Sequence, residues 1–162
     1  SGQGTSGTSL AAQLDARLDT EKQDTLLTWA ARHGQAEAVR LLLEAGASVG
    51  ATTGGGASAL LIACQNGHLE CARLLLEANA TVNQATEDGA TPLLVACWQG
   101  HVECARLLRD AGASIDQAQE SGATPLFIAC QNDQRECARL LPGSGASVKQ
   151  PKGRGSTTLL MA

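Results

Sequence analysis

Aromatic residues are scarce in this sequence. They make up 2% of its 162 residues, as two tryptophans, one phenylalanine and no tyrosine, whereas 43% of all residues are hydrophobic. A core must therefore be built from Leu, Ala, Val and Cys, and these small side chains favour closely packed helices over a sheet sandwich. The chain is long enough for one domain with a substantial core.

An excess of basic charge and a long apolar run are also missing. The formal net charge is −4, which gives no general attraction to nucleic acid or to an anionic membrane. No apolar stretch approaches the roughly 20 residues of a membrane-spanning helix, and no signal-peptide pattern is present. We expect no nucleic-acid partner, no membrane insertion and an intracellular location, cytoplasmic or nuclear.

What the sequence does contain is a repeat of 33 residues. The phrase "SALLIACQNGHLECARLLLEANATV" (58–82) returns as "TPLLVACWQGHVECARLLRDAGASI" (91–115) and "TPLFIACQNDQRECARLLPGSGASV" (124–148). A looser copy, "TLLTWAARHGQAEAVRLLLEAGASV", occupies 25–49, and a fifth begins at 157. Each copy predicts a short helix, a turn, a longer helix and a loop. One such unit cannot bury its apolar face alone, so we expect the units to stack.

These units resemble ankyrin repeats. The stretch "GATPLLVACWQGHVECARLLRDAGASI" (89–115) is similar to the family's pattern of a TPLHLAA phrase, a Gly-His turn and a GA loop. The resemblance covers roughly residues 20–162. It implies an all-α ankyrin-repeat solenoid of stacked helix-turn-helix units with β-turn fingers. It also implies a non-catalytic module that binds a partner protein or peptide, the alternative being a regulatory or targeting domain of a larger enzyme or channel.

The repeat register divides the chain into seven segments. We expect a flexible lead at 1–9, a capping helix at 10–19, four repeats at 20–52, 53–85, 86–118 and 119–151, and a partial fifth repeat or C-terminal cap at 152–162. The fourth repeat is irregular, because Asp133–Gln134 replaces the Gly-His turn and Pro142 is expected to end or kink its second helix. We expect the isolated chain to be a monomer.

All six cysteines occupy two positions of the repeat. They are Cys64, Cys97 and Cys130 at the end of the first helix, and Cys71, Cys104 and Cys137 on the apolar face of the second. Equivalent positions in stacked units lie about 8–10 Å apart, which is too far for a disulfide or a shared zinc ion. Pairing within one unit is geometrically conceivable, but C-x6-C is not a zinc-site spacing. We expect buried packing cysteines, with a redox role as the alternative, and neither metal nor cofactor.

Catalytic patterns are also missing. His68 and His101 fall in the turn before the second helix, and no histidine accompanies a repeated nucleophile and an aspartate. The segment "TTGGGAS" (52–58) lacks P-loop spacing and its lysine, so we interpret it as a flexible finger. The arginines Arg40, Arg73, Arg106 and Arg139 each follow a glutamate by three residues, which predicts ion pairs on an exposed outer face. We expect no enzymatic activity.

The resemblance places a variable pair from each first helix in a concave groove. These residues are Arg32, His33, Gln65, Asn66, Trp98, Gln99, Gln131 and Asn132. Trp98 is either a binding hot spot or a residue packed against its own finger or the next repeat. The finger tips add Glu87, Asp88 and Glu120, whose charge suits a basic or amide-rich extended segment, together with Glu21–Lys22 and Lys152–Arg154 at the two ends.

Two further residues carry expectations. Trp29 occupies an apolar position of the first copy, where we expect it to seal the N-terminal end of the core. Asn83 follows Val82 in the loop where, by the resemblance, ankyrin repeats can be substrates of an asparaginyl hydroxylase. The equivalent residues of the other copies are not asparagine, so Asn83 is the best candidate for this modification.

Overall fold

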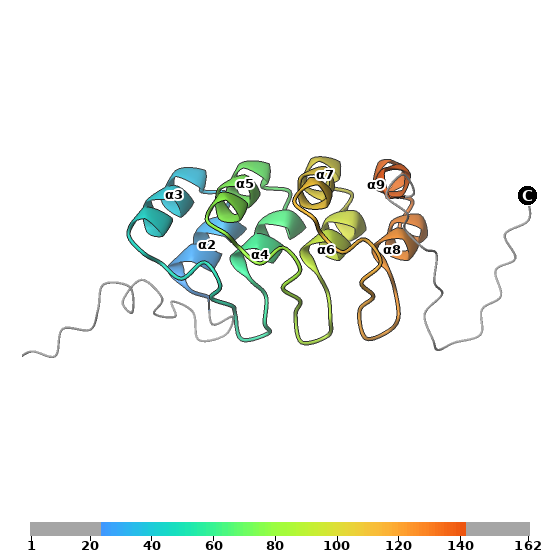
Figure 1. Ribbon diagram of the computed structural model, residues 1–162, viewed down its shortest axis with the longest axis horizontal. Coiled ribbons are helices and arrows are strands. Elements are labelled where there is room, and N and C mark those ends of the chain that lie inside the picture. Colours follow the sequence, from blue (N-terminus) through green and yellow to red (C-terminus); the bar gives the residue numbers. More distant parts are fainter. Residues whose placement is uncertain (1–23, 142–162) are drawn as a thin grey trace, which may run out of the picture.

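The structure, a computed structural model, describes residues 24–141 as a row of four helix pairs (Figure 1). The first helices of the pairs are α2 (Leu26–Arg32), α4 (Ala59–Gln65), α6 (Pro92–Gln99) and α8 (Pro125–Gln131). The second helices are α3 (Ala36–Glu44), α5 (Leu69–Glu77), α7 (Val102–Asp110) and α9 (Arg135–Leu140). One pair falls within each of the four repeat ranges. The all-α solenoid expected from the repeats is therefore the fold.

Hydroxyl side chains start every first helix. Thr25, Ser58, Thr91 and Thr124 each accept a hydrogen bond from the backbone N–H three residues later, at 3.2 to 3.3 Å. These caps satisfy backbone donors that the first turn leaves without partners, and each contributes about 1 kcal/mol. In α6 and α8 a proline follows the cap, at a position where its missing N–H costs nothing.

The helices form two layers. The first helices α2, α4, α6 and α8 pack side by side in one row, and the second helices α3, α5, α7 and α9 pack in another. Between the rows lies a core of small aliphatic side chains and thiols, in which Leu60, Leu75, Leu93 and Leu108 are fully buried. The scarcity of aromatic residues is thus matched by a core that alanine, leucine and cysteine fill.

A hairpin-like finger precedes each of α4, α6 and α8. The backbone N–H groups of Thr53, Thr86 and Gln119 donate to the carbonyl four residues later, at 2.9 to 3.1 Å. The segment 52–58, expected to be a flexible finger, forms such a turn and is closed by a Thr52–Ser58 bridge. Figure 1 shows the three fingers extending beyond the first helices on the same side of the stack.

The fourth pair is shorter than the others. α9 has 6 residues, whereas α3, α5 and α7 have 9 each. Pro142, which we expected to end this helix early, lies outside the described residues. The same holds for the expected lead at 1–9, the capping helix at 10–19, the partial repeat at 152–162, and the tips Glu21–Lys22 and Lys152–Arg154. Within residues 24–141, no helix is long and apolar enough to cross a bilayer.

Candidate functional site

The C-terminal ends of the first helices present a row of exposed side chains. His33 ends α2, Gln65–Asn66 ends α4, Trp98–Gln99 ends α6 and Gln131–Asn132 ends α8, and all are exposed. The finger tips Glu87, Asp88 and Glu120 are exposed as well. We call these residues together the groove face. Ten of the eleven residues selected from the sequence thus lie on it with accessible side chains.

Arg32 is the eleventh, and it is held by an ion pair. Its guanidinium donates two hydrogen bonds to Asp24, at 2.9 and 3.1 Å, and the Asp24 side chain is only 3% exposed. A bidentate pair of this kind is geometrically specific and costly to break when its acid is buried. Arg32 therefore secures the N-terminal end of the described stack, in addition to bordering the groove face.

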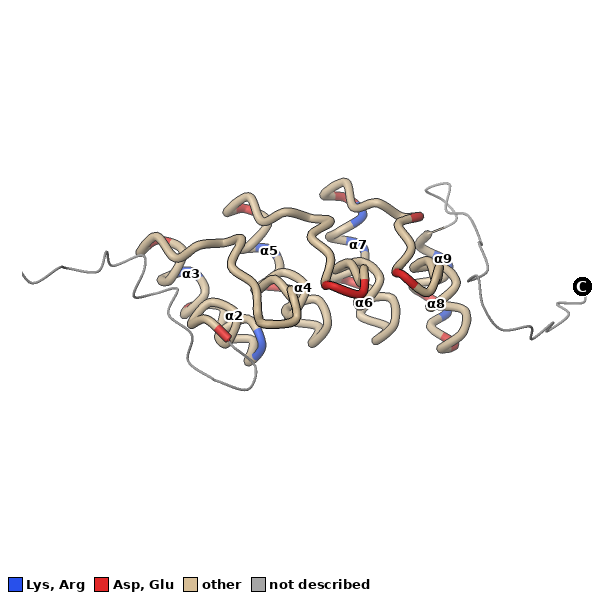
Figure 2. Tube along the Cα trace, turned by 90° about the horizontal axis from the view of Figure 1, so that it is seen from below, with Lys and Arg blue, Asp and Glu red and all other residues tan. Residues whose placement is uncertain are grey.

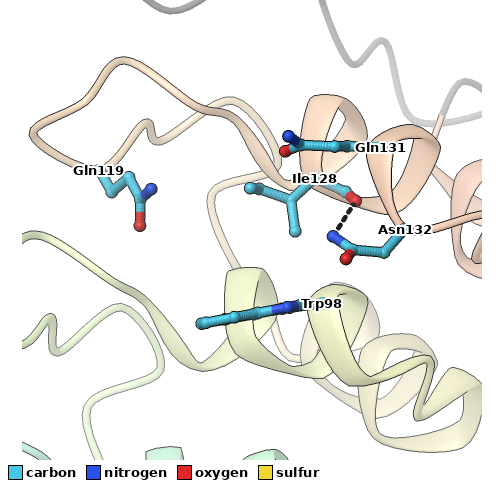
Figure 3. Close-up of a pocket in the computed structure, with 5 residues that line it drawn as sticks. All are labelled: Trp98, Gln119, Ile128, Gln131 and Asn132. Carbon is cyan, nitrogen blue, oxygen red and sulfur yellow. Dashed lines mark hydrogen bonds between the residues drawn. The ribbon is translucent and has the colours of Figure 1, made fainter.

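Trp98 projects from the middle of the groove face. Its side chain is 52% exposed, although an indole of this size is usually largely buried. Beside it lies a hollow of about 470 Å³ lined by Trp98, Gln119, Ile128, Gln131 and Asn132. In Figure 3 the indole extends along α6, opposite Ile128 and Asn132 of α8, while Gln119 approaches from the finger. The hollow therefore joins two neighbouring repeats and one finger.

Amide groups give this hollow its polarity. The Asn132 side-chain amide donates to the Ile128 carbonyl at 2.9 Å, so its oxygen remains as an acceptor (Figure 3). Asn66 makes the same bond to Ile62 at 2.8 Å in the second repeat. Each asparagine therefore also closes the last turn of its own helix. Gln119 and Ile128 were not among the residues selected from the sequence, because the repeat pattern does not tell how a finger approaches the next helix.

The exposure of Trp29 differs from our expectation. We expected it in the core, but its side chain is 44% exposed. The equivalent residues Ile62, Val95 and Ile128 are buried, because branched aliphatic chains fit the space under the fingers. The larger indole extends outward, where its ring packs edge-on against His33 with centroids 4.3 Å apart. Trp29 therefore lies beside His33 at the N-terminal end of the groove face, and its larger size than that of its aliphatic equivalents is the sequence signal for that.

The acidic finger tips have no cationic partners among the described residues. Every arginine between residues 24 and 141 forms an ion pair with an acid elsewhere, and this segment contains no lysine. Glu120 donates its backbone N–H to the Asp88 carbonyl at 3.0 Å, which holds two neighbouring tips together. Figure 2 shows the acidic tips (red) of the fingers before α6 and α8 close to each other. Among residues 24–141, therefore, no cation pairs with the negative charge at the rim of the groove face.

The outer face has a different electrostatic character. Glu37–Arg40, Glu70–Arg73, Glu103–Arg106 and Glu136–Arg139 form the expected pairs three residues apart. All of these side chains are substantially exposed, so each pair contributes only a few tenths of a kcal/mol. This confirms the prediction of an ion-paired outer face. It also makes the unpaired acids of the finger tips stand out.

Five of the six cysteines are buried, and Cys130 is exposed. The expectation of uniformly buried cysteines is therefore wrong for Cys130, which lies in the last described repeat. Its equivalents Cys64 and Cys97 instead meet a thiol from the second helix of the following repeat. Hydrogen bonding to Cys104, with burial, raises the pKa of the Cys64 thiol. Cys137 and burial likewise raise that of Cys97.

In each of these pairs the hydrogen bond acts oppositely on the partner, and lowers the pKa of Cys104 and Cys137. Burial and the charge of Glu70 also raise the pKa of Cys71. A raised pKa disfavours the thiolate, which is the form that attacks electrophiles and binds metals. Within the described part of the chain, no group of three or more His, Cys, Asp or Glu side chains is arranged to hold a metal ion.

The histidines serve the connections between repeats. The Nε2 atoms of His68 and His101 lie 3.1 and 3.2 Å from the carbonyl oxygens of Arg32 and Gln65 in the preceding repeats. In the fourth repeat the Gln134 amide donates to the Trp98 carbonyl at 3.4 Å. Gln134 therefore takes the histidine's place, and the contact between neighbouring repeats is kept despite the altered turn of the fourth repeat.

Asn83 connects two loops. Its side-chain oxygen accepts the backbone N–H of Ser114 from the next repeat at 2.8 Å. The side chain is partly exposed. Its candidacy for hydroxylation stays a prediction.

Stacked helix pairs with hairpin fingers define a helical repeat protein. A sequence model described as ankyrin repeats (3 copies) matches residues 6–86, 27–119 and 78–152. The chain therefore belongs to the ankyrin repeat family, as its sequence resemblance indicated. No curated protein gives a significant match to the chain. Ankyrin repeats act generally as protein–protein interaction modules and are typically non-catalytic.

Proposed function

We propose that this chain binds a partner protein or peptide through the groove face, without catalysing a reaction. The observation that carries the proposal is Trp98, an indole half exposed to solvent beside a hollow in the middle of the stack. Exposure of so large an apolar side chain is unfavourable unless a partner covers it, and tryptophan is enriched among the residues that dominate binding energy. The surrounding amides and finger tips supply the polar rim that such interfaces have.

The test is capture of partners from a lysate of the native host. The 162-residue chain is compared with its Trp98→Ala variant and with Arg106→Ala, whose side chain lies on the outer face of α7 in the same repeat. We expect Trp98→Ala to weaken capture of a specific partner by tenfold or more, which corresponds to about 1.4 kcal/mol. Arg106→Ala should retain the partner.

Stability is measured in parallel. Trp98→Ala should change the free energy of unfolding by about 1 kcal/mol or less, as expected for a surface substitution. A partner set that is the same for the wild type and both variants would refute the groove face as the binding surface.

A further inference from the structure

The hollow beside Trp98 has a size and lining that suit one side chain of a partner protein together with the partner residues next to it. Its volume of about 470 Å³ falls within the roughly 300–1,000 Å³ of ligand pockets. One wall is the face of an indole, another is the aliphatic side chain of Ile128, and the rest are amides. The occupant must therefore be flat or apolar along its length and rich in hydrogen-bond donors at its tip.

The available acceptors favour a donor-rich occupant. The amide nitrogens of Asn132 and Gln119 each already donate one hydrogen bond, to the Ile128 carbonyl and to the Ser121 hydroxyl, so the oxygens of these two amides are available as acceptors. Gln131 adds a further amide oxygen at the same hollow. A guanidinium presents five N–H donors in one plane, stacks on an indole and keeps its charge at any physiological pH. The compact ammonium group of lysine stacks less well on an indole. A carboxylate in the hollow would be repelled by the nearby carboxylate of Glu120.

The charge around the hollow points to the same chemistry. Glu120 directly follows the lining residue Gln119, and the Glu120–Asp88 backbone hydrogen bond brings the next acidic tip alongside. Within residues 24–141, Glu87, Asp88 and Glu120 have no cation of their own, and no group of acids there is arranged to hold a metal ion. A partner that supplies the missing positive charge must bring it on side chains spread over two fingers.

The repeat spacing sets the shape of the partner. Neighbouring first helices pack roughly 8–10 Å apart, and an extended chain advances about 3.3 Å per residue. About three residues of extended chain therefore match one repeat. The exposed pairs at Gln65–Asn66, Trp98–Gln99 and Gln131–Asn132 repeat at this interval. A segment of about seven to ten residues would cover all three.

We propose that the groove face binds an extended, arginine-containing segment of a partner protein. One arginine stacks on the Trp98 indole in the hollow, its guanidinium donating to the amide oxygens there. Basic residues on either side of that arginine pair with Glu87, Asp88 and Glu120. This assignment rests on the proposed function, and it adds to it the chemical class of the bound segment.

The test uses labelled ten-residue peptides in which arginine alternates with serine and glycine. Binding to the full chain is measured by fluorescence anisotropy at low salt, because exposed charge pairs are screened within about 10 Å at 0.1 M salt. Three comparison peptides replace every arginine by lysine, by glutamate or by citrulline, the last being close in shape to arginine but uncharged. We expect the arginine peptide to bind most tightly, the lysine peptide several-fold more weakly, and the other two not at all.

Variants of the chain assign the contacts. Trp98→Ala should weaken arginine-peptide binding about tenfold. Replacing Glu87, Asp88 and Glu120 by Gln, Asn and Gln should weaken it by about two- to fivefold per carboxylate and reduce its dependence on salt. Glu77→Gln is the matched control, because Glu77 is an exposed acid on α5 outside the groove face that forms no ion pair among the described residues.

The outcomes separate this inference from the proposed function. Equal binding of the citrulline and arginine peptides would overturn the inference, and so would undiminished binding by the triple variant. If no peptide binds while Trp98→Ala still loses its partner from lysate, the arginine assignment fails and the protein-binding function stands. If Trp98→Ala also leaves partner capture unchanged, both fail.

Discussion

Buried thiols form part of the core where neighbouring repeats meet. Cys64 on α4 meets Cys104 on α7, and Cys97 on α6 meets Cys137 on α9. Each contact joins the first helix of one repeat to the second helix of the next. Because a thiol is a small, polarisable and weakly polar group, it packs there much as an alanine or a valine would. The cysteines therefore connect neighbouring repeats as ordinary core residues.

Stability should fall at alkaline pH because of these thiols. Below pH 9, the ordinary pKa of the thiol, the unfolded chain keeps its thiols protonated. Above it the unfolded chain loses these protons while Cys64, Cys71 and Cys97, whose pKa values are raised, retain theirs. The pKa values of Cys104 and Cys137 are lowered by their partner thiols, so these two contribute in the opposite direction. The thiols with raised pKa values decrease the unfolding free energy as the pH rises, by at most about 1.4 kcal/mol per pH unit for each of them.

Urea unfolding under reducing conditions, at about pH 8 and about pH 10, measures this loss. The decrease should be smaller for Cys71→Ala than for the wild type, because burial is the main cause of the raised pKa of Cys71 and no second thiol is affected by its removal. Cys130→Ala is the control, because its side chain is exposed, and its removal should leave the pH dependence unchanged. Equal pH dependence for Cys71→Ala and the wild type would show that the thiol of Cys71 ionises in the folded protein.

The positions and contacts of single side chains could be predicted from the sequence where the equivalent residues of the repeats are of the same type. The Glu–Arg pairs of the outer face were predicted from their spacing and are confirmed. The prediction that Trp29 is buried was wrong because the repeat pattern marks its position as apolar but does not give the space available there. An indole is larger than the side chains of Ile62, Val95 and Ile128, which are buried at the equivalent positions. The contact of Cys64 with Cys104 was missed because aligning repeats compares equivalent positions, whereas this contact is diagonal between non-equivalent ones.

The turn between the two helices of each repeat is the element that fixes their angle. Gly34, Gly67 and Gly100 adopt positive φ angles of 66°, 73° and 78°. Asp133 occupies the same place in the fourth repeat with φ of 54°, a conformation that aspartate tolerates better than most residues. In the first three repeats a side chain from the following repeat, His68, His101 or Gln134, covers the turn and lies within hydrogen-bonding distance of a carbonyl at the end of the first helix.

Gly67→Ala should therefore destabilise the stack. The substitution places a Cβ in the left-handed region, which costs about 1–2 kcal/mol, and that Cβ would lie 2.6 Å from Nδ1 of His101. Both effects lower the free energy of unfolding, and the clash also disturbs the bond from His101 to the Gln65 carbonyl. Thermal or urea unfolding would show the loss.

Asp133→Gly provides the comparison for this turn. It places glycine where the first three repeats already have it, and Asp133 otherwise makes only an exposed ion pair with Arg135. We expect its unfolding free energy to stay within about 1 kcal/mol of the wild type. A Gly67→Ala variant as stable as Asp133→Gly would mean that the turn adapts without strain.

The helices and their order could be predicted from the 33-residue repeat, since apolar spacing, capping hydroxyls and turn glycines all recur at the same places. The hollow could not be predicted in this way. It depends on how the finger bearing Gln119 approaches α8 and on the size of Ile128 relative to the neighbouring indole. Such contacts between successive repeats depend on the three-dimensional distance between a finger and a helix, which the linear pattern does not contain.

The stack as a whole separates its stabilising and binding surfaces. The core between the two helix rows holds neighbouring repeats together, and in a repeat protein such nearest-neighbour contacts account for much of the stability. The ion pairs of the outer face lie within single helices and add little. The groove face contributes little to this packing and carries the exposed indoles and unpaired acids. Substitutions on the groove face should therefore change binding far more than stability.

The fluorescence of Trp98 tests this central claim most directly. The chain has two tryptophans, so a Trp29→Phe variant reports Trp98 alone, and a Trp98→Phe variant reports Trp29 at the N-terminal end of the groove face. Quenching by acrylamide is measured for each variant, free and bound to the partner captured from lysate. We predict that Trp98 is readily quenched in the free chain and strongly protected in the complex. Equal quenching of Trp98 in the two states would contradict the assignment of the groove face as the binding surface.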